Sequence, residues 1–434
     1  MTMNPRQVAL NGLLKVSQGR SLSDVTPTFK SLEPNDRGLV TELVFGTLHH
    51  YFELRAIAKG LLSRPLKSND KDVMLCLMLG IYQLHYTRIP DHAAINETVA
   101  LCDGLNKGWG KSILNAILRR IQRSPDIIET FEMTKPCRYN LPNWLYDQLL
   151  EDWGKDAQNW LSHMHTKAPI TLRVNRMKIS RDDYLAKLTH AEIAATALPY
   201  ASEGIHLATA TAITSLPGYH QGLFSVQDGA AQNAAMILDP QSGEHILDAC
   251  AAPGGKSAHI LELTGNTAQL VALDNVDQRL DRLRENLTRL TLSADIRCGD
   301  AMTPLDWSND GELFDRILCD APCSATGIIR RHPDICQHRT MKDVKRLNQT
   351  QWRILKSLWS CLKPGGTMVY STCSVLHSEN DGIIADFLRQ NDDATLVPFA
   401  NPLTQEITDG TWQIFPGTEQ MDGFFYAKLY KSAN

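Results

Sequence analysis

The sequence lacks the paired cysteines that mark most zinc and redox sites. Its ten cysteines are scattered singly, and no two form a Cys-x-x-Cys motif. We therefore expect no metal, and thiols that are mostly reduced and buried. Reduced, scattered cysteines are typical of cytoplasmic proteins.

Long apolar runs are also missing. The longest nearly unbroken apolar stretch, Val73 to Tyr82, is about half of the roughly 18 residues that suggest a membrane span. The beginning, Met1 to Arg6, has no charged and then apolar layout of an export signal. With 43% apolar and 21% charged residues the composition is that of an ordinary globular protein. We expect a cytoplasmic protein with no membrane partner.

Charge is unevenly distributed along the chain. The formal net charge is −4, yet residues 1–140 carry 18 Lys and Arg against 13 Asp and Glu. The remainder carries 26 against 35 and is acidic. An acidic total argues against a protein that coats nucleic acid nonspecifically. The first third of the chain is the better binder of a polyanion.

The periodicity of apolar residues predicts a multidomain protein with three parts. Residues 1–135 show helical spacing throughout, with Val73 to Leu84 as a buried central helix, so we expect an all-α domain. Residues 136–228 predict a small α+β accessory module of RRM-like or PUA-like type. In residues 229–434 strands alternate with helices or loops, which predicts an α/β Rossmann-like domain with a parallel sheet.

Individual elements of the last two parts can be placed from the same patterns. In the α+β module we expect a helix over Trp144 to Trp153 and a strand over Ile170 to Val174. The strands expected in the Rossmann-like domain are His245 to Ala249, Gln269 to Leu273, Ala294 to Cys298, Asp315 to Cys319 and Thr367 to Ser371.

A loop of small residues follows the first of these strands. Its backbone can approach a cofactor closely, and the helix that it opens offers unpaired N–H donors. Asp274 and Asp300 follow the next two strands at the same edge, where carboxylates can bind ribose hydroxyls and an adenine amino group. The loop lacks the third glycine of the dinucleotide-binding motif, and Gly255-Lys-Ser257 has no glycine five residues before it, as a P-loop requires. S-adenosylmethionine therefore fits better than NAD or ATP. The alternative is a plain strand-to-helix turn beside solvated carboxylates. The loop consists of Cys250, Ala251, Ala252, Pro253, Gly254, Gly255 and Lys256.

Two cysteines end two further strands. Cys323 stands in Asp320-Ala-Pro-Cys-Ser324 and Cys373 in Ser371-Thr-Cys-Ser374. A thiolate attacks electron-poor carbon, and a second group can remove a proton or assist release, as methyl transfer to pyrimidine C5 requires. Asp320 is placed to hold the cofactor's reactive end or the edge of a cytosine. Taken singly, either cysteine would more often be an inert core residue.

A thiol needs a positive environment to become a nucleophile. Lys256, Arg330 and Arg331 are candidates for that field. The two arginines equally suit a phosphate, which a planar guanidinium clamps well, or a solvated loop.

These motifs together resemble the NOL1/NOP2/Sun family of RNA cytosine-C5 methyltransferases. The N-terminal helices are similar to the NusB antitermination fold, through Ala94-Ile-Asn-Glu97 and the helix ending Asn115-Ala-Ile-Leu-Arg119. The resemblance covers nearly the whole chain. The catalytic-domain motifs that carry it are Cys250 to Lys256, Asp320 to Gly327, Arg330 to Asp334 and Ser371 to Ser374.

The resemblance implies an enzyme and assigns roles. The loop Cys250 to Lys256, with Asp274, Asp300 and Asp320, would line S-adenosylmethionine. Cys373 would attack and Cys323 would serve release, an order that the spacing alone leaves open. The implied substrate is 16S rRNA, at the cytosine numbered 967, single-stranded or flipped out of its stack. Basic residues expected to bind RNA, or else to form solvated surface, are Lys111, Arg119, Arg120, Arg123, Arg330 and Arg331.

Two rival functions remain open at this point. One is a methyltransferase for tRNA, another rRNA site or protein, which analysis of the product nucleoside would distinguish. The other is a noncatalytic RNA-binding or assembly factor with an inactive domain, which a radiolabelled methyl-transfer assay would reveal. We expect a monomer.

Overall fold

The computed structural model describes residues 4–209, 211–309 and 311–433, which form two compact units. One comprises the described residues up to 155 together with 329–339, and the other comprises 156–328 with the residues from 340 onward. Across these described ranges no helix is long and apolar enough to cross a membrane. The same ranges contain no cluster of His, Cys, Asp or Glu side chains suited to a metal ion.

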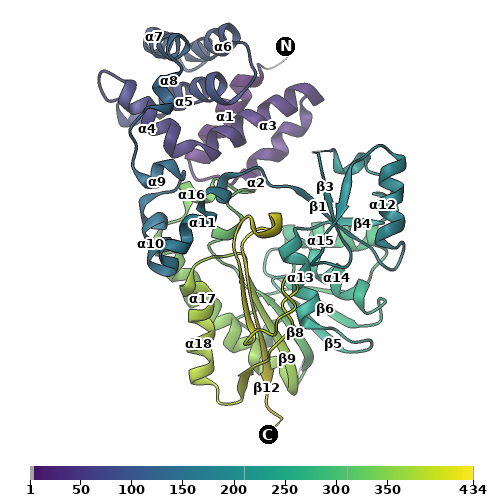
Figure 1. Ribbon diagram of the computed structural model, residues 1–434. Coiled ribbons are helices and arrows are strands. Elements are labelled where there is room, and N and C mark those ends of the chain that lie inside the picture. Colours follow the sequence, from purple (N-terminus) through teal and green to yellow (C-terminus); the bar gives the residue numbers. More distant parts are fainter. Residues whose placement is uncertain (1–3, 210, 310, 434) are drawn as a thin grey trace. The chain divides into compact units, whose positions relative to one another are not determined.

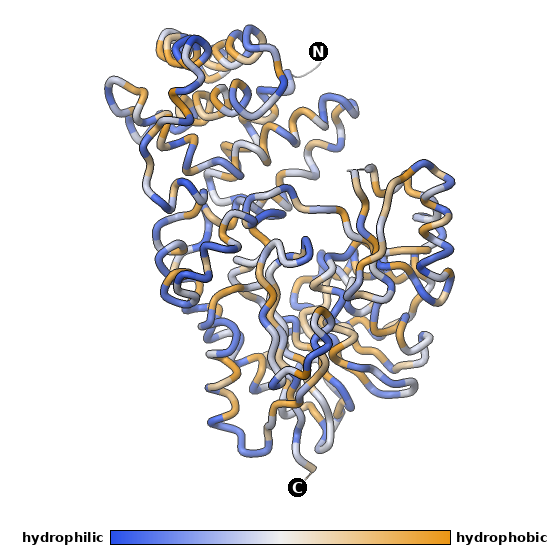
Figure 2. Tube along the Cα trace, in the orientation of Figure 1, coloured by the Kyte–Doolittle hydropathy of each residue, from blue (hydrophilic) through white to orange (hydrophobic). Residues whose placement is uncertain are grey.

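The first unit is all-helical, as predicted for its first 135 residues (Figure 1). Its centre is α5 (Lys71–Tyr86), in which every residue from Leu75 to Gln83 is buried, so the predicted central helix is confirmed. Along the helices apolar and polar residues alternate with the helical repeat (Figure 2), which directs the apolar faces inward. The other elements are α1 (Pro5–Ser17), α2 (Leu22–Val25), η1 (Thr26–Ser31), α3 (Pro34–His49), α4 (Tyr51–Leu61), η2 (Ser68–Asp70), α6 (Asp91–Gly104), α7 (Gly110–Arg123), α8 (Asp126–Glu129), α9 (Lys135–Arg138), α10 (Asn143–Trp153) and α16 (Ile335–His338).

The helix α16 reaches this unit from a distant part of the sequence. Asp334, which precedes it, accepts a hydrogen bond from the backbone N–H of Leu22 at 2.9 Å. The Nε2 atom of His338 lies 2.8 Å from the carbonyl oxygen of Val16. The segment 329–339 therefore packs on the N-terminal helices, more than 300 residues away in sequence.

The second unit begins with a small α+β module. Its four strands pair antiparallel in the order β2-β3-β1-β4, and β1 (Ile170–Val174) has the bounds that the sequence predicts. Tyr184 of α12 (Arg181–His190) packs on the sheet with Leu172, Ile205 and Phe224. The remaining elements are η3 (Gly154–Ala157), which begins in the last residues of the first unit, α11 (Gln158–Leu161), η4 (Ser162–His165), β2 (Ala195–Ala197), β3 (Gly204–Leu207), η5 (Ile213–Ser215) and β4 (Phe224–Val226).

The rest of the unit is built around an eight-stranded sheet. Five strands run parallel in the order β9-β8-β5-β6-β7, and all five were predicted. The C-terminal strand β12 (Phe424–Lys431) runs antiparallel to β9. The five predicted strands form the expected parallel sheet, and antiparallel strands added at one edge make the whole sheet mixed. The others are β5 (His245–Ala249), β6 (Gln269–Asp274), β7 (Asp295–Cys298), β8 (Phe314–Asp320), β9 (Leu362–Thr372), β10 (Ala394–Leu396) and β11 (Thr411–Ile414).

Helices cover both faces of this sheet (Figure 1). Strand residues alternate between the two faces, so Ile246 packs with α13–α15, whereas Leu247 packs with α17 and α18. Burial on both faces explains why these strands read as continuous apolar runs. The helices are α13 (Gly229–Leu238), α14 (Gly255–Leu263), α15 (Asp277–Leu290), α17 (Met341–Cys361) and α18 (Asp381–Gln390), with the short turns η6 (Pro304–Asp306), η7 (Thr326–Ile328), η8 (His377–Glu379) and η9 (Thr418–Gln420).

Candidate active site

A cleft of about 230 Å³ opens at the carboxyl ends of the parallel strands. Carboxyl ends of neighbouring parallel strands meet at one edge, which is where open α/β sheets bind ligands. Chain segments from five strand ends and from α17 meet there. The lining residues are Cys250, Ala252, Leu273, Asp274, Asn275, Arg279, Gly299, Asp300, Ala301, Met302, Asp320, Ala321, Pro322, Cys323, Ala325, Thr350, Ile354 and Cys373.

The loop after β5 is held tightly against its neighbours. Gly254 has φ of +93° and caps α14, and a Cβ atom there would lie 2.9 Å from the Leu283 side chain. Glycine is required for both reasons. The backbone N–H of Ala251 donates to the carbonyl of Leu273 at 2.8 Å, so the loop is fixed to the end of β6.

Asp274 connects the loop to the next strand. Its carboxylate, almost fully buried, accepts from the N–H of Ala252 at 3.2 Å and from the N–H of Val276 at 3.2 Å. Arg279 lies 3.3 Å from the same carboxylate and donates to the carbonyl of Ala252 at 3.0 Å. Asp300, half-buried, accepts from the N–H of Met302. Three features expected to hold a cofactor thus border one cleft.

Lys256 and Asp320 form an ion pair inside the site. The Lys256 Nζ atom lies 2.5 Å from Asp320 Oδ2, and Ser371 Oγ donates to Asp320 Oδ1 at 3.0 Å. Burial alone would lower the pKa of Lys256, but the charge and hydrogen bond of Asp320 outweigh it and raise that pKa. The Lys256 cation also lies 5.3 Å from the centre of the Phe424 ring.

The two cysteines meet at the cleft. Their Sγ atoms lie 3.4 Å apart, with Cys323 buried and Cys373 half-buried. The N–H of Gly327 donates to the Cys373 carbonyl at 2.9 Å, which links the two loops that carry them. The hydrogen bond to Cys373, burial, and the negative charges of Cys373 and Glu379 raise the pKa of the Cys323 thiol. Cys373 is the more accessible sulfur.

The expected site residues thus divide into three groups. Cys250, Ala252, Asp274, Asp300, Asp320, Cys323 and Cys373 line the cleft, while Ala251, Pro253, Gly254, Gly255 and Lys256 lie behind it in the loop or next to it. The basic residues expected to bind RNA belong to the helical unit. Lys111, Arg119, Arg120 and Arg123 lie on α7, with Lys111 paired to Asp103, while Arg330 is buried and Arg331 half-buried.

Sequence reasoning missed three buried side chains beneath the cleft. Asp248 accepts a hydrogen bond from Ser257 at 2.5 Å, and Arg173 donates to the carbonyl of Gly255 at 2.7 Å. Glu379 accepts hydrogen bonds from residues beside both cysteines. A charged residue within an otherwise apolar strand, as for Asp248 and Arg173, is the available sequence signal.

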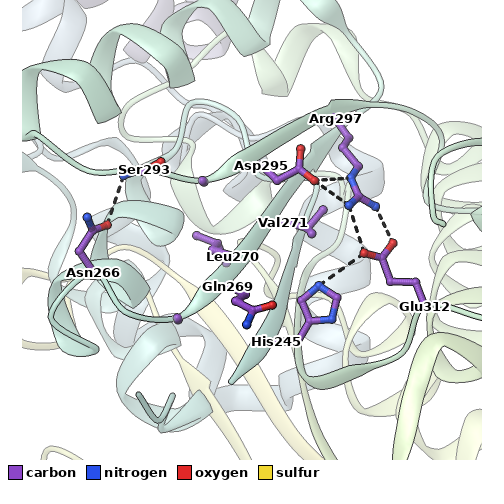
Figure 3. Close-up of a pocket in the computed structure, with 11 residues that line it drawn as sticks. His245, Asn266, Gln269, Leu270, Val271, Ser293, Asp295, Arg297 and Glu312 are labelled. Carbon is purple, nitrogen blue, oxygen red and sulfur yellow. Dashed lines mark hydrogen bonds and ion pairs between the residues drawn. The ribbon is translucent and has the colours of Figure 1, made fainter. Parts of the chain in front are cut away.

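A second hollow, of about 480 Å³, lies at the opposite end of the strands (Figure 3). Arg297 faces the carboxylates of Glu312 and Asp295, with its nitrogens 2.6 Å from each. His245 points toward Glu312. None of the predicted site residues lines this hollow, so the chemistry expected from the sequence is concentrated at the other end of the sheet.

Comparison with known proteins identifies the family. Residues 235–430 match the family described as 16S rRNA methyltransferase RsmB/F, residues 3–123 the NusB family, and residues 141–214 the RsmF/B-like ferredoxin-like domain. The chain is 43% identical to the ribosomal RNA small subunit methyltransferase B of Pseudomonas putida, over 99% of each chain. The chain belongs to the RsmB/F family.

Two solved structures share the fold of the second unit's methyltransferase part. A methyltransferase homolog from Pyrococcus horikoshii is 32% identical, with a TM-score of 0.59 over 68% of this chain and 97% of the other. NSun6 from the same organism, solved with SFG, is 22% identical, with a TM-score of 0.60 over 68% of this chain and 98% of the other, and shows the fold alone. The predicted family resemblance, NusB-like helices, α+β module and Rossmann-like domain of this RsmB/F protein are confirmed.

Proposed function

We propose that this member of the 16S rRNA methyltransferase family transfers a methyl group from S-adenosylmethionine to C5 of a specific cytosine, the one numbered 967, through a covalent bond between Cys373 and C6. The observation that carries the proposal is the 3.4 Å separation of the Cys323 and Cys373 sulfurs at a cleft bordered by carboxylates. One thiolate that adds to C6 and a second group that assists release are what methyl transfer to C5 of a pyrimidine requires.

The cleft fits S-adenosylmethionine in its donor set. Asp274 and Asp300 offer carboxylate oxygens for ribose hydroxyls and an adenine amino group, and the close approach at Gly254 leaves the loop backbone uncovered by a side chain. When bound, the cofactor supplies an electrophilic methyl group. The presence of SFG, an S-adenosylmethionine analogue, in the NSun6 structure supports the same choice.

The first step falls to Cys373. Its thiolate adds to C6 of the cytosine, forming an S–C6 bond, and the electrons of the C5–C6 double bond make C5 a nucleophile. The Lys256 cation supplies positive charge beside the cleft. Asp320, paired with Lys256, accepts a hydrogen bond from the exocyclic amino group of the base and so orients the ring.

Release falls to Cys323. Once C5 carries its methyl group, its remaining proton must leave, and the S–C6 bond must break to restore the ring and return the Cys373 thiolate. Cys323 lies next to Cys373 and is buried, so it assists this elimination without meeting bulk water. The raised pKa keeps Cys323 a neutral thiol near neutral pH, so its S–H donates to the Cys373 sulfur as the S–C6 bond breaks, while the C5 proton passes to a water molecule.

The target cytosine must leave its stack to reach this cleft. Flipping costs a few kcal/mol in a duplex and less in a loop of folded RNA. The basic residues of α7 are our candidates for holding the RNA backbone during this step. We infer that the protein works as a cytoplasmic monomer without a metal.

Product analysis tests the proposal directly. The purified protein is incubated with radiolabelled S-adenosylmethionine and unmodified 16S rRNA, and the labelled nucleoside is identified after digestion. We expect 5-methylcytosine at one position. Label in another nucleoside, in tRNA or in protein would show a different substrate, and no transfer at all would favour the noncatalytic alternative.

The cysteines can be separated by their variants. Cys373→Ala should abolish methylation and form no adduct, whereas Cys323→Ala should accumulate a protein–RNA adduct that survives denaturing electrophoresis. Cys137→Ala, which removes a half-buried thiol in the other unit, is the control and should behave as the wild type. Normal turnover by Cys323→Ala would refute its role in release.

A further inference from the structure

Glu379 is a completely buried acidic residue at the end of η8. Its Oε1 atom accepts from the backbone N–H of Ser324 at 2.7 Å. Its Oε2 atom accepts from Ser324 Oγ at 2.5 Å and from Ser374 Oγ at 2.6 Å. Ser324 directly follows Cys323, and Ser374 directly follows Cys373. One carboxylate therefore bonds to both cysteine-bearing loops.

Two further contacts fix Glu379 itself. The Gln351 side chain donates to Oε1 at 3.2 Å and to the carbonyl of Pro322 at 3.0 Å. The Tyr370 hydroxyl donates to the Glu379 main-chain carbonyl at 2.8 Å. A buried carboxylate is costly unless several donors surround it, and here Ser324, Ser374 and Gln351 supply them from three different segments of the domain. Because burying this carboxylate costs free energy, we expect it to serve a function.

We propose that Glu379 is a positioning residue that holds Cys323 and Cys373 in register, touching neither RNA nor cofactor. This inference rests on the function proposed above for the two thiols. The bond from Gly327 N–H to the Cys373 carbonyl already links the two loops. Glu379 adds bonds at the residues that directly follow the two cysteines, and these fix the 3.4 Å separation of the sulfurs.

The charge of Glu379 adds a second consequence. It is among the causes that raise the pKa of the Cys323 thiol, after the hydrogen bond to Cys373, burial and the charge of Cys373. Removing the charge should lower the pKa of Cys323. That change is measurable as a shift in the pH profile of Cys323 alkylation in a Cys373→Ser background. A purely structural role for Glu379 would leave the profile where it is.

Glu379→Gln is the primary test because it keeps the size and removes the charge. One of its two acceptor atoms becomes a donor that faces the N–H or hydroxyl donors of the loops. We expect kcat to fall by about 10²-fold, as small misplacements of reacting groups do. KM for RNA and for S-adenosylmethionine should change by less than about twofold. An unchanged kcat would overturn the proposal.

A second measurement follows the sulfurs without any methyl transfer. Diamide accepts two electrons and two protons from a pair of thiols, which become a disulfide. In the wild type Cys323 and Cys373 should couple rapidly, and Glu379→Gln should slow the coupling about tenfold or more. Should the variant not fold, Ser374→Ala, which loses only one bond to the carboxylate, replaces it and should also slow coupling.

Glu312→Gln is the matched control, a partly buried carboxylate at the opposite end of the sheet (Figure 3). It loses an ion pair with Arg297, so stability should fall while the coupling rate stays that of the wild type. Equal coupling rates in Glu379→Gln and the wild type would refute the positioning role. A slowed rate in Glu379→Gln, with no methylcytosine formed by the wild type, would support the positioning role and sink only the proposed function.

Discussion

Lys256 and Asp320 form an ion pair of 2.5 Å between the glycine loop and the end of β8. Lys256→Met should leave Asp320 without its cation and remove the positive charge beside Cys373. We expect kcat to fall by about 10²-fold, the scale for loss of one preorganised charge. Steady-state methylation with each substrate varied measures it.

The control uses the other end of the same strand. Lys363 pairs with Asp315 at 2.7 Å near the start of β8. Lys363→Met removes an equivalent ion pair remote from the cleft and should keep wild-type kcat. Equal losses in the two variants would mean that Lys256 matters for stability alone.

The buried carboxyl group of Asp248 should make the unfolding free energy fall as pH rises. Burial is the largest cause that raises its pKa, from 3.8 to about 7, although Ser257 bonds to it. Between these two values the unfolded state has released the proton and the folded state has not, so the unfolding free energy falls as pH rises. The fall attributable to Asp248 is at most roughly 4 kcal/mol.

Denaturant titrations from pH 4 to pH 8 test this. Asp248→Asn should lack that part of the slope, and the difference between the wild type and the variant should grow from pH 4 to pH 7. Asp315 has the opposite sign: burial would raise its pKa, but the hydrogen bonds and charges of Lys363 and His245 together lower it. Asp315→Asn should therefore lose stability above pH 4 rather than gain it. Parallel curves for the wild type and Asp248→Asn would contradict the assignment.

Arg173 is a fully buried cation that joins the α+β module to the cofactor loop. Its guanidinium donates to Glu262 at 3.0 Å through two nitrogens, and also to Gln227 and to the carbonyl of Gly255. Arg173→Met should cost about 3–5 kcal/mol because Glu262 stays buried and uncompensated. Binding of S-adenosylmethionine should weaken as well, since the start of α14 loses its support.

Removing both charges separates these effects. In Arg173→Met with Glu262→Met most of the stability should return, while the weakened cofactor binding should persist. Chemical denaturation and calorimetric titration with S-adenosylmethionine measure the two quantities. A double variant that is less stable than Arg173→Met alone would show that the pair is not the source of the loss.

Much of this architecture could be predicted from local patterns in the sequence. The strands β1 and β5 have the bounds that alternation and apolar runs predict, because both are short, apolar and bounded by turn residues. The strand β12 also reads as apolar, but its antiparallel direction depends on pairing with β9, which no local pattern encodes. Glu379 was missed for the same reason. Its partner Ser324 is 55 residues away, and nothing around Glu379 distinguishes it from a solvated carboxylate.

The cleft residues were predictable for a different reason. Asp274, Asp300 and Asp320 each follow a strand, and parallel strands place their carboxyl ends together whatever the sequence of the helices between them. That Cys323 and Cys373 act together was inferred from their places at two strand ends, and only the order of their roles needed the family resemblance. Their contact depends on β8 lying beside β9, which is a property of the sheet order. The ends of the strands could be predicted from the sequence, but the order of the strands in the sheet could not.

The exposed arginines of α7 remain predicted RNA contacts, and charge reversal tests them. Arg120 and Arg123 are exposed near the C-terminal end of the helix. Arg120→Glu with Arg123→Glu should raise KM for 16S rRNA by about tenfold and reduce its salt dependence, because fewer phosphate counterions are released. The affinity for S-adenosylmethionine should not change.

The control reverses an equal charge elsewhere in the same unit. Arg55 and Lys59 are exposed on α4, so Arg55→Glu with Lys59→Glu alters net charge identically. Point variants are a more specific test than deletion of the helical unit. A deletion would remove Leu22, which bonds to Asp334, and Val16, which bonds to His338, and would disturb the segment 329–339. If both double variants raise KM equally, the effect is one of net charge. An increase in KM for 16S rRNA in the α7 variant alone would show that α7 contacts the RNA backbone.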